Sequence, residues 1–205
     1  MKNLFAALAL AAMLVAPAHA AALYASSTDF LQKVAPGAYT ETFDREDYSR
    51  PRTTIFSNGT YSYSAFGDDG LWFNGAAMST GYGYDELIVT FTGAPVTAIG
   101  GNFYITDHVE RFMATMLTIV LSDGTRVTST PASVADSYLG FTSEIGITSI
   151  VLSTQEPWEF ATIDNFTVGS ALVDAPGEVP EPVSLALLGA GLLAAAAARR
   201  RRRAG

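Results

Sequence analysis

The sequence predicts an all-β fold: an antiparallel, jelly-roll-like β-sandwich with one short N-terminal helix, flanked by a signal peptide and a C-terminal transmembrane helix. Between residues 39 and 168, short runs of β-branched and aromatic residues are interrupted by Gly, Asp, Asn and Pro. Apolar and polar residues alternate in several runs, most clearly in Leu117–Leu121. About ten such runs favour two packed sheets, with a barrel as the alternative.

The expected elements follow in chain order. A helix is predicted over Thr28–Val34, with Thr28 as its cap and Pro36-Gly37 as its end. Hairpin turns are predicted at Ser57-Asn58-Gly59 and Ser122-Asp123-Gly124. The expected strands are Tyr39–Phe43, Thr53–Ser57, Thr60–Phe66, Leu71–Phe73, Glu86–Thr92, Val96–Ile105, Thr115–Leu121, Thr125–Thr130, Tyr138–Phe141, Ile147–Ser153 and Phe160–Val168.

The charge of the chain is unevenly distributed. The 205 residues have a net charge of −8 and include no Cys, which excludes disulfides, thiolate metal sites and Cys nucleophiles. From Ala21 to Val179 there are six basic and nineteen acidic residues, a net charge of −13. Such a body repels phosphates, so we expect no nucleic-acid partner. His108 is the single His of that body, which excludes zinc sites built from several imidazoles.

The first twenty residues have the pattern of a secretory signal peptide. Lys2 precedes the apolar run Leu4–Val15, and Ala18-His19-Ala20 is a small-x-small cleavage site. An uncleaved anchor is the alternative, but twelve helical residues reach only about 18 Å. We therefore predict a signal peptide at 1–20, cut by signal peptidase after Ala20, a body exported by the secretion machinery at 21–169, and a linker at 170–178.

The C-terminal end has three parts in a fixed order. Val179, Pro180, Glu181 and Pro182 come first, and the apolar run Val183–Ala198 follows. The apolar run would span about 24 Å as a helix. Five arginines then form a cytoplasmic stop: Arg199, Arg200, Arg201, Arg202 and Arg203. A simple tail anchor is the alternative to a sorting signal.

Val179–Gly205 resembles the PEP-CTERM sorting signal, through Pro180-Glu181-Pro182, the short apolar segment and the Arg-rich end. The resemblance implies a Gram-negative bacterium, processing by an exosortase, and a location first at the inner membrane and then at the cell surface or in the extracellular matrix. We therefore expect an envelope- or exopolysaccharide-associated structural or binding protein, and not an enzyme. A secreted glycan-processing enzyme on a jelly-roll scaffold is the alternative.

The body also resembles other exported PEP-CTERM bodies, which are similar in layout to carbohydrate-binding jelly rolls. Thr40–Phe43, Pro95–Gly100, Asp123–Thr125 and Ile163–Phe166 carry this resemblance. The resemblance implies that an acid near the first body strand approaches an Asp beside the last strand. We therefore expect Glu41 and Asp164 to hold a structural calcium ion, with ordinary turn chemistry as the alternative.

Two groups of residues could belong to an enzyme, and both have a simpler explanation. Glu156 and Glu159 flank Pro157-Trp158, but the spaced acids of jelly-roll glycosidases are not found here, and a solvated loop accounts for them. Asp107-His108-Val109-Glu110 combines one His with two acids and is explained by a polar surface loop. We therefore expect no catalytic residues.

Aromatic residues supply the remaining candidate site. Trp72, Trp158, Tyr82 and Tyr84 could stack on sugar rings, because aromatic side chains pair an apolar face with a polar edge. The alternative places both Trp residues in the core and the Tyr residues on strand surfaces. Any binding to an exopolysaccharide would then depend on stacking and hydrogen bonds, or on calcium that bridges two anionic partners, since the acidic body offers no general attraction for acidic polymers.

Overall fold

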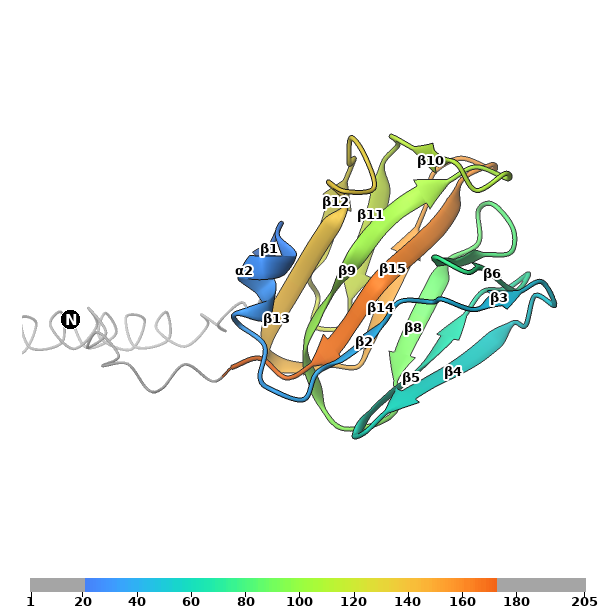
Figure 1. Cartoon of the computed structure of the whole chain (residues 1–205). Coiled ribbons are helices and arrows are strands. Elements are labelled where there is room, and N and C mark those ends of the chain that lie inside the picture. The colour runs from blue at the N-terminus through green and yellow to red at the C-terminus, as the bar shows by residue number, and fades with distance from the viewer. Residues whose placement is uncertain (1–20, 173–205) are drawn as a thin grey trace, which may run out of the picture. The chain divides into compact units, whose positions relative to one another are not determined.

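The computed structural model describes residues 21–172, which form a two-sheet antiparallel sandwich (Figure 1). The nine-stranded sheet contains, in spatial order, β1 (Ala22–Tyr24), β13 (Tyr138–Ile147), β9 (Val96–Thr106), β15 (Phe160–Gly169), β7 (Met78–Thr80), β6 (Leu71–Asn74) and β3 (Glu46–Asp47), with β10 (Phe112–Met113) beside β9 and β2 (Tyr39–Glu41) beside β15. The six-stranded sheet contains β12 (Arg126–Ser129), β11 (Leu117–Leu121), β14 (Ser149–Ser153), β8 (Leu87–Phe91), β5 (Tyr61–Phe66) and β4 (Thr53–Asn58). The predicted sandwich is confirmed.

All eleven expected strands are present. Both predicted hairpins also form, with Gly59 and Gly124 in the left-handed region at φ values of 61° and 95°. The structure adds the short strands β1, β3, β7 and β10, which have two or three residues each and therefore too few for an alternating pattern. Strand β2 ends earlier than predicted, because Phe43 has a φ of 54° and leaves the extended conformation.

The helix α2 (Ser27–Leu31) begins one residue before the predicted start, so the prediction of Thr28 as the cap was wrong. Ser26 has the extended backbone of a cap, and its Oγ accepts a hydrogen bond from the backbone N–H of Asp29. Phe30 fixes the helix on the outer face of the nine-stranded sheet. A Cβ atom would lie 2.7 Å from the Phe30 ring at position 100 and 2.5 Å from it at position 140. Gly100 and Gly140 therefore leave the space that the ring occupies.

The main core lies between the two sheets and is rich in aromatic rings. Tyr63 stacks on Phe56 at 4.9 Å between ring centroids and meets Phe166 edge-on at 5.3 Å. The alternation of strand β11 is confirmed, because its odd-numbered residues belong to this core. In β15 the inward residues Ile163 and Phe166 are three apart, since Asn165, with a φ of 50°, forms a bulge between them.

The predicted terminal segments, at 1–20 and 179–205, lie outside the described residues, as does most of the predicted linker. Within residues 21–172, no helix has the length and apolar character needed to cross a membrane. Leu172, the last described residue, donates its backbone N–H to Lys33 O at 2.7 Å, and Ala171 forms a bridge with Val34. The described chain therefore remains bonded to the body up to its last residue.

Candidate functional site

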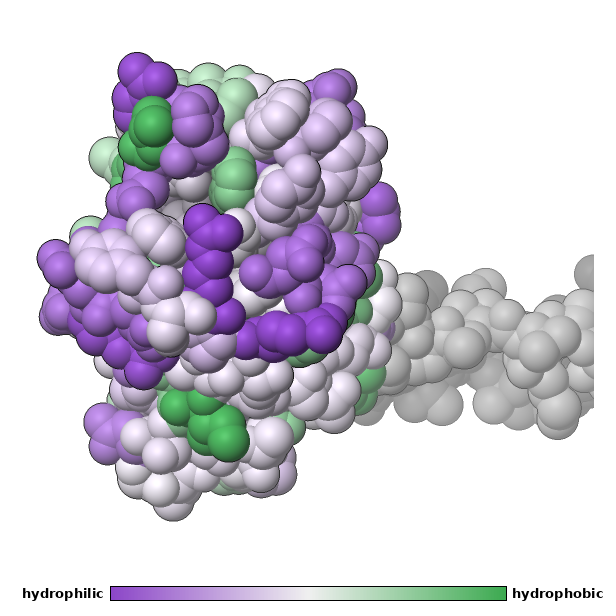
Figure 2. Space-filling view, turned by 90° about the vertical axis from the view of Figure 1, so that its right-hand side faces the viewer, coloured by the Kyte–Doolittle hydropathy of each residue, from purple (hydrophilic) through white to green (hydrophobic). Residues whose placement is uncertain are grey.

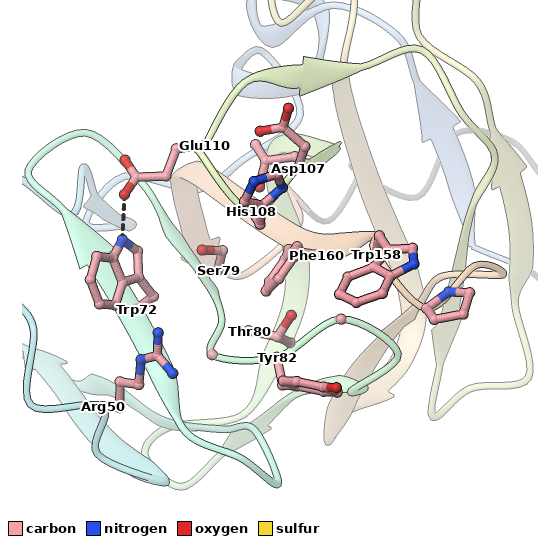
Figure 3. Close-up of a pocket in the computed structure, with 14 residues that line it drawn as sticks. Arg50, Trp72, Ser79, Thr80, Tyr82, Asp107, His108, Glu110, Trp158 and Phe160 are labelled. Atoms are coloured by element: carbon pink, nitrogen blue, oxygen red, sulfur yellow. Dashed lines mark hydrogen bonds between the residues drawn. The ribbon is translucent and has the colours of Figure 1, made fainter.

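A groove with a volume of about 300 Å³ lies on the outer side of the nine-stranded sheet, where β6, β7, the end of β9 and the start of β15 meet. This volume is at the lower end of the range for small-molecule sites, roughly 300–1,000 Å³. The side of the molecule that carries β3, β4 and β6 is mainly purple and white in Figure 2, with few green patches. The groove is lined by Arg50, Trp72, Ser79, Thr80, Gly81, Tyr82, Gly83, Thr106, Asp107, His108, Glu110, Pro157, Trp158 and Phe160 (Figure 3).

The groove brings together three of the four aromatic residues predicted to bind a ligand. Trp158 and Tyr82 line it and are 67% and 53% exposed, while Trp72 lines it and is half-buried. Tyr84 is 59% exposed and follows in the same loop as Tyr82, but it does not line the groove. None of the four belongs to the buried core of the described chain. Their role in binding stays a prediction.

The loop that carries Tyr82 and the loop that carries Trp158 are packed tightly against each other. A Cβ on Gly83 would lie 2.2 Å from the carbonyl oxygen of Pro157, so the close approach of the two loops requires a glycine there. The backbone N–H of Tyr84 donates to Glu159 O at 3.3 Å. Because the loops are joined by these contacts, Tyr82 and Trp158 keep a fixed relative position.

Glu159 organises the loop that carries Trp158. Its side chain is buried, with 3% exposure, and its Oε2 accepts hydrogen bonds from the backbone N–H groups of Gln155 and Glu156, both at 3.0 Å. Glu156 is exposed. The two acids that the sequence analysis considered as a catalytic pair are therefore different in kind: one is a buried acceptor for the loop backbone, and the other lies in solvent.

Trp72 forms the other end of the groove and is held on several sides. Its Nε1 donates to Glu110 Oε1 at 2.6 Å, and Asn74 Nδ2 donates to the second oxygen of the same carboxylate at 2.8 Å. The Arg50 guanidinium lies 5.2 Å from the centre of the Trp72 ring, and the Tyr48 ring centroid lies 4.9 Å away. These contacts make Trp72 a rigid wall of the groove.

The Asp107, His108 and Glu110 side chains all line the groove, although the sequence analysis assigned them to an ordinary surface loop. Asp107 accepts three hydrogen bonds, from the backbone N–H of Val109, the backbone N–H of Arg111 and Arg111 Nε. The backbone hydrogen bond from Arg111 is the largest cause that lowers the pKa of Asp107. Asp107 is therefore an ionised acceptor that closes its own turn, which is the opposite of what a general acid requires.

Left-handed backbone conformations are concentrated at this site. Five non-glycine residues of the described chain have positive φ values, and Arg50 (53°) and Glu110 (64°) line the groove, while Tyr84 (79°) ends its loop. Such conformations cost of order 1–3 kcal/mol each and are frequent at functional sites. The left-handed backbone of Arg50 and Glu110 could not be predicted, because Arg and Glu rarely adopt it and nothing in their residue type indicates it.

The floor of the groove includes a buried hydroxyl group without a protein partner. Thr80 is 1% exposed, and its Oγ1 makes no hydrogen bond within the described chain. By contrast, the hydroxyl of Thr106, a neighbouring groove residue, is hydrogen-bonded to that of Thr162 at 3.0 Å. An unsatisfied buried polar group is uncommon in folded proteins, but this hydroxyl is fully buried and Thr80 pairs with the core residue Leu71, so the outward partner of Trp72 on this strand is Ser79.

The predicted calcium ligands Glu41 and Asp164 have separate partners. Glu41 accepts hydrogen bonds from the Tyr39 hydroxyl and from the backbone N–H of Phe43. Asp164 accepts from the backbone N–H and side-chain amide of Asn165, at 2.6 Å and 2.8 Å. Burial raises the pKa of Asp164, the Asn165 N–H opposes this, and the carboxylate of Asp44 raises it further.

Within residues 21–172 there is no group of three or more His, Cys, Asp or Glu residues that could hold a metal ion. Calcium prefers six to eight oxygen ligands, so a site at Glu41 and Asp164 would need several backbone or water oxygens. Calcium binding by these two residues stays a prediction.

Comparison with known proteins identifies one feature, which lies outside the described residues. Residues 178–203 match the PEP-CTERM protein-sorting motif, in agreement with the resemblance noted for residues 179–205. No curated protein and no solved structure matches the chain. The motif implies an exported protein that passes through the membrane, is processed by an exosortase and belongs to the extracellular surface.

Proposed function

We propose that this exported, exosortase-processed protein binds carbohydrate in the groove between Trp72 and Trp158, and that this binding associates it with exopolysaccharide at the cell surface. The observation that carries the proposal is that aromatic side chains from three separate segments line one groove. Exposed Trp and Tyr rings are costly to leave in water, and they stack on the apolar faces of sugar rings.

The groove has the features of a preformed binding site. The Glu159 carboxylate holds the Trp158 loop, and the Glu110 carboxylate holds the Trp72 indole. Because these groups are already ordered in the free protein, a ligand does not have to supply the entropy of ordering them. Polar groups that line the groove between the rings, among them Ser79 and His108, supply partners for sugar hydroxyls.

The arrangement of the carboxylates favours binding over catalysis. Glycoside hydrolysis requires one carboxyl group that donates a proton and a second that acts as a base or a nucleophile. In the groove, Asp107 and Glu110 each accept hydrogen bonds from protein donors on both carboxylate oxygens. The pKa of Asp107 is lowered, so this residue is unsuited to the role of a proton donor at neutral pH.

The proposal is tested by measuring the binding of the purified protein to a glycan array and to exopolysaccharide in affinity electrophoresis. We expect Trp158→Ala and Tyr82→Ala each to weaken binding about fivefold or more, since stacking of a ligand ring on an aromatic side chain contributes about 1–3 kcal/mol where it has been measured for nucleobases. Ile55→Ala is the matched control, because Ile55 is a 73% exposed apolar residue on β4, in the other sheet. Equal binding by all three variants would refute the proposed function.

A further inference from the structure

We infer that the glycan bound in this groove is acidic, and that Arg50 binds a carboxylate of the sugar chain. The inference rests on the proposed function and adds the chemical class of the ligand. It is drawn from the distribution of charged groups around the groove, from the backbone that fixes Arg50, and from the positions of the rings relative to that residue.

Arg50 is the groove cation without an acidic partner in the described chain. Of the other basic residues near this face, Arg111 is paired with Asp107 at 3.1 Å and Arg52 is paired with Asp68. The Arg50 guanidinium lies over the ring of Trp72 and forms no salt bridge within residues 21–172. When a guanidinium lies over an aromatic ring, its N–H groups point outward in the plane of the guanidinium, so they can still donate to a ligand.

The acidic residues of the groove do not compete for Arg50. Glu110 is occupied by Trp72 Nε1 and Asn74 Nδ2, and Asp107 is occupied by Arg111 and two backbone N–H groups. Both donors to Glu110 are neutral, so this residue keeps its negative charge, but no carboxylate of the described groove is bonded to the Arg50 guanidinium, in a body with a net charge of −13. Arg50 is thus a cation in an otherwise acidic body, and a carboxylate of a ligand can bind to it.

The backbone holds Arg50 in a fixed position relative to the aromatic loop. Arg50 has a φ of 53°, and a Cβ on Gly70 would lie 2.6 Å from the Arg50 carbonyl oxygen, so the two backbones are in close contact. Gly70 in turn accepts a hydrogen bond from the backbone N–H of Gly81 at 2.7 Å, next to Tyr82. The Arg50 backbone and the Tyr82 loop are thus parts of one ordered unit, and the guanidinium itself rests against the Trp72 ring.

Figure 3 shows how a ligand would lie. Arg50 and Trp72 are at one end of the groove, Trp158 is at the other, and Ser79 and Thr80 lie between them. A sugar ring stacked on Trp158 would place a neighbouring unit of the same chain near Arg50. The guanidinium presents two parallel N–H donors that match a carboxylate, whereas a neutral sugar has no group of this geometry.

The test compares acidic oligosaccharides with their neutral counterparts. Hexamers of galacturonate, mannuronate and the glucuronate-containing hyaluronan repeat are titrated into the full-length protein, each alongside its carboxyl-reduced form. The emission of Trp72 and Trp158, the two Trp residues of the chain, reports binding. We expect at least one acidic hexamer to bind about tenfold more tightly than its reduced form, and Arg50→Gln to remove that difference.

Arg126→Gln is the matched control, because Arg126 is an exposed Arg on β12, in the six-stranded sheet. It should leave the preference for the acidic hexamer unchanged. The inference is overturned if no acidic hexamer is preferred by the wild type, or if Arg50→Gln and Arg126→Gln behave alike. If Trp158→Ala still weakens binding in that case, the acidic ligand is wrong but the proposed function stands; if Trp158→Ala has no effect on any hexamer, the proposed function itself fails.

Discussion

Replacing Glu159 with Ala should destabilise the protein and disorder the loop that carries Trp158, although the Glu159 side chain is buried and does not contact the proposed ligand. The carboxylate is 3% exposed and accepts two backbone N–H groups on the same oxygen, Oε2, both at 3.0 Å. Glu159→Ala leaves both donors without their partner. Glu159→Gln keeps one oxygen that can accept both bonds and removes only the negative charge.

The expected magnitudes follow from these two bonds. Hydrogen bonds to a charged group contribute about 1.5–3 kcal/mol each, but the exposed loop can partly rehydrate its free N–H groups. We therefore expect Glu159→Ala to lower the free energy of unfolding by about 2–4 kcal/mol and Glu159→Gln by about 1 kcal/mol. Glu156→Ala is the control, because Glu156 is exposed, and such substitutions usually change stability by less than about 0.5 kcal/mol.

Urea unfolding followed by tryptophan fluorescence measures these differences, and affinity electrophoresis measures the loss of glycan binding. Glu159→Ala should weaken binding more than Glu159→Gln, because Trp158 loses its fixed position. The reasoning would be refuted if Glu159→Ala were as stable as Glu156→Ala. It would also fail if the Ala and Gln variants of Glu159 were equally destabilised, since the oxygen acceptor would then be irrelevant.

Four further predictions concern other parts of the chain. Tyr63→Phe should raise the free energy of unfolding by about 1 kcal/mol in urea titrations, because the buried Tyr63 hydroxyl has no partner in the described chain; a loss of stability would contradict this. Asp164→Asn should stabilise the protein at pH 7 and make little difference at acidic pH. Burial and Asp44 raise the folded-state pKa of Asp164, so the folded protein disfavours the ionised carboxylate, and wild-type stability falls as the pH rises through that pKa. Asn cannot ionise and avoids this loss. If Asp164 and Glu41 hold calcium, millimolar calcium should raise the melting temperature of the wild type and not of Asp164→Asn, whereas identical melting curves with calcium and with chelator would exclude the site. Residues 179–205, fused to an exported reporter in a host with an exosortase, should give a product that has lost the tail, and Glu181→Ala should leave it full length on immunoblots; a wild-type tail that is never removed would contradict the sorting assignment.

The fold could be predicted from the sequence wherever one face of a strand is buried and the other is not. Leu117–Leu121 and its hairpin are examples, because the alternation and the Asp123-Gly124 turn are both local signals. Strand β7 was missed because all three of its residues are buried, which leaves no alternation. The bulge at Asn165 was missed because its left-handed backbone depends on the pairing with β9 and not on the local sequence.

The candidate site was only partly predictable for the same reason. Tyr82 could be identified as an exposed aromatic residue from its Gly-rich loop, whereas the sequence left open whether Trp158 lies in the core or on the surface. Their meeting in one groove depends on the pairing of β15 with β7, which sequence patterns do not reveal. The contacts of Arg50 and Glu110 with Trp72 could not be predicted, because Trp72 is more than twenty positions away from each of them in the chain.

The most direct test of the central claim uses Trp158 as a single fluorescent reporter. In Trp72→Phe, Trp158 is the only Trp that remains, and it is 67% exposed in the free protein. A saturating acidic hexamer should shift its emission and lower its accessibility to acrylamide, because a stacked sugar ring covers the indole. If the hexamer binds this variant in affinity electrophoresis while the emission and the acrylamide quenching of Trp158 stay unchanged, the ligand lies elsewhere and the groove is not the binding site.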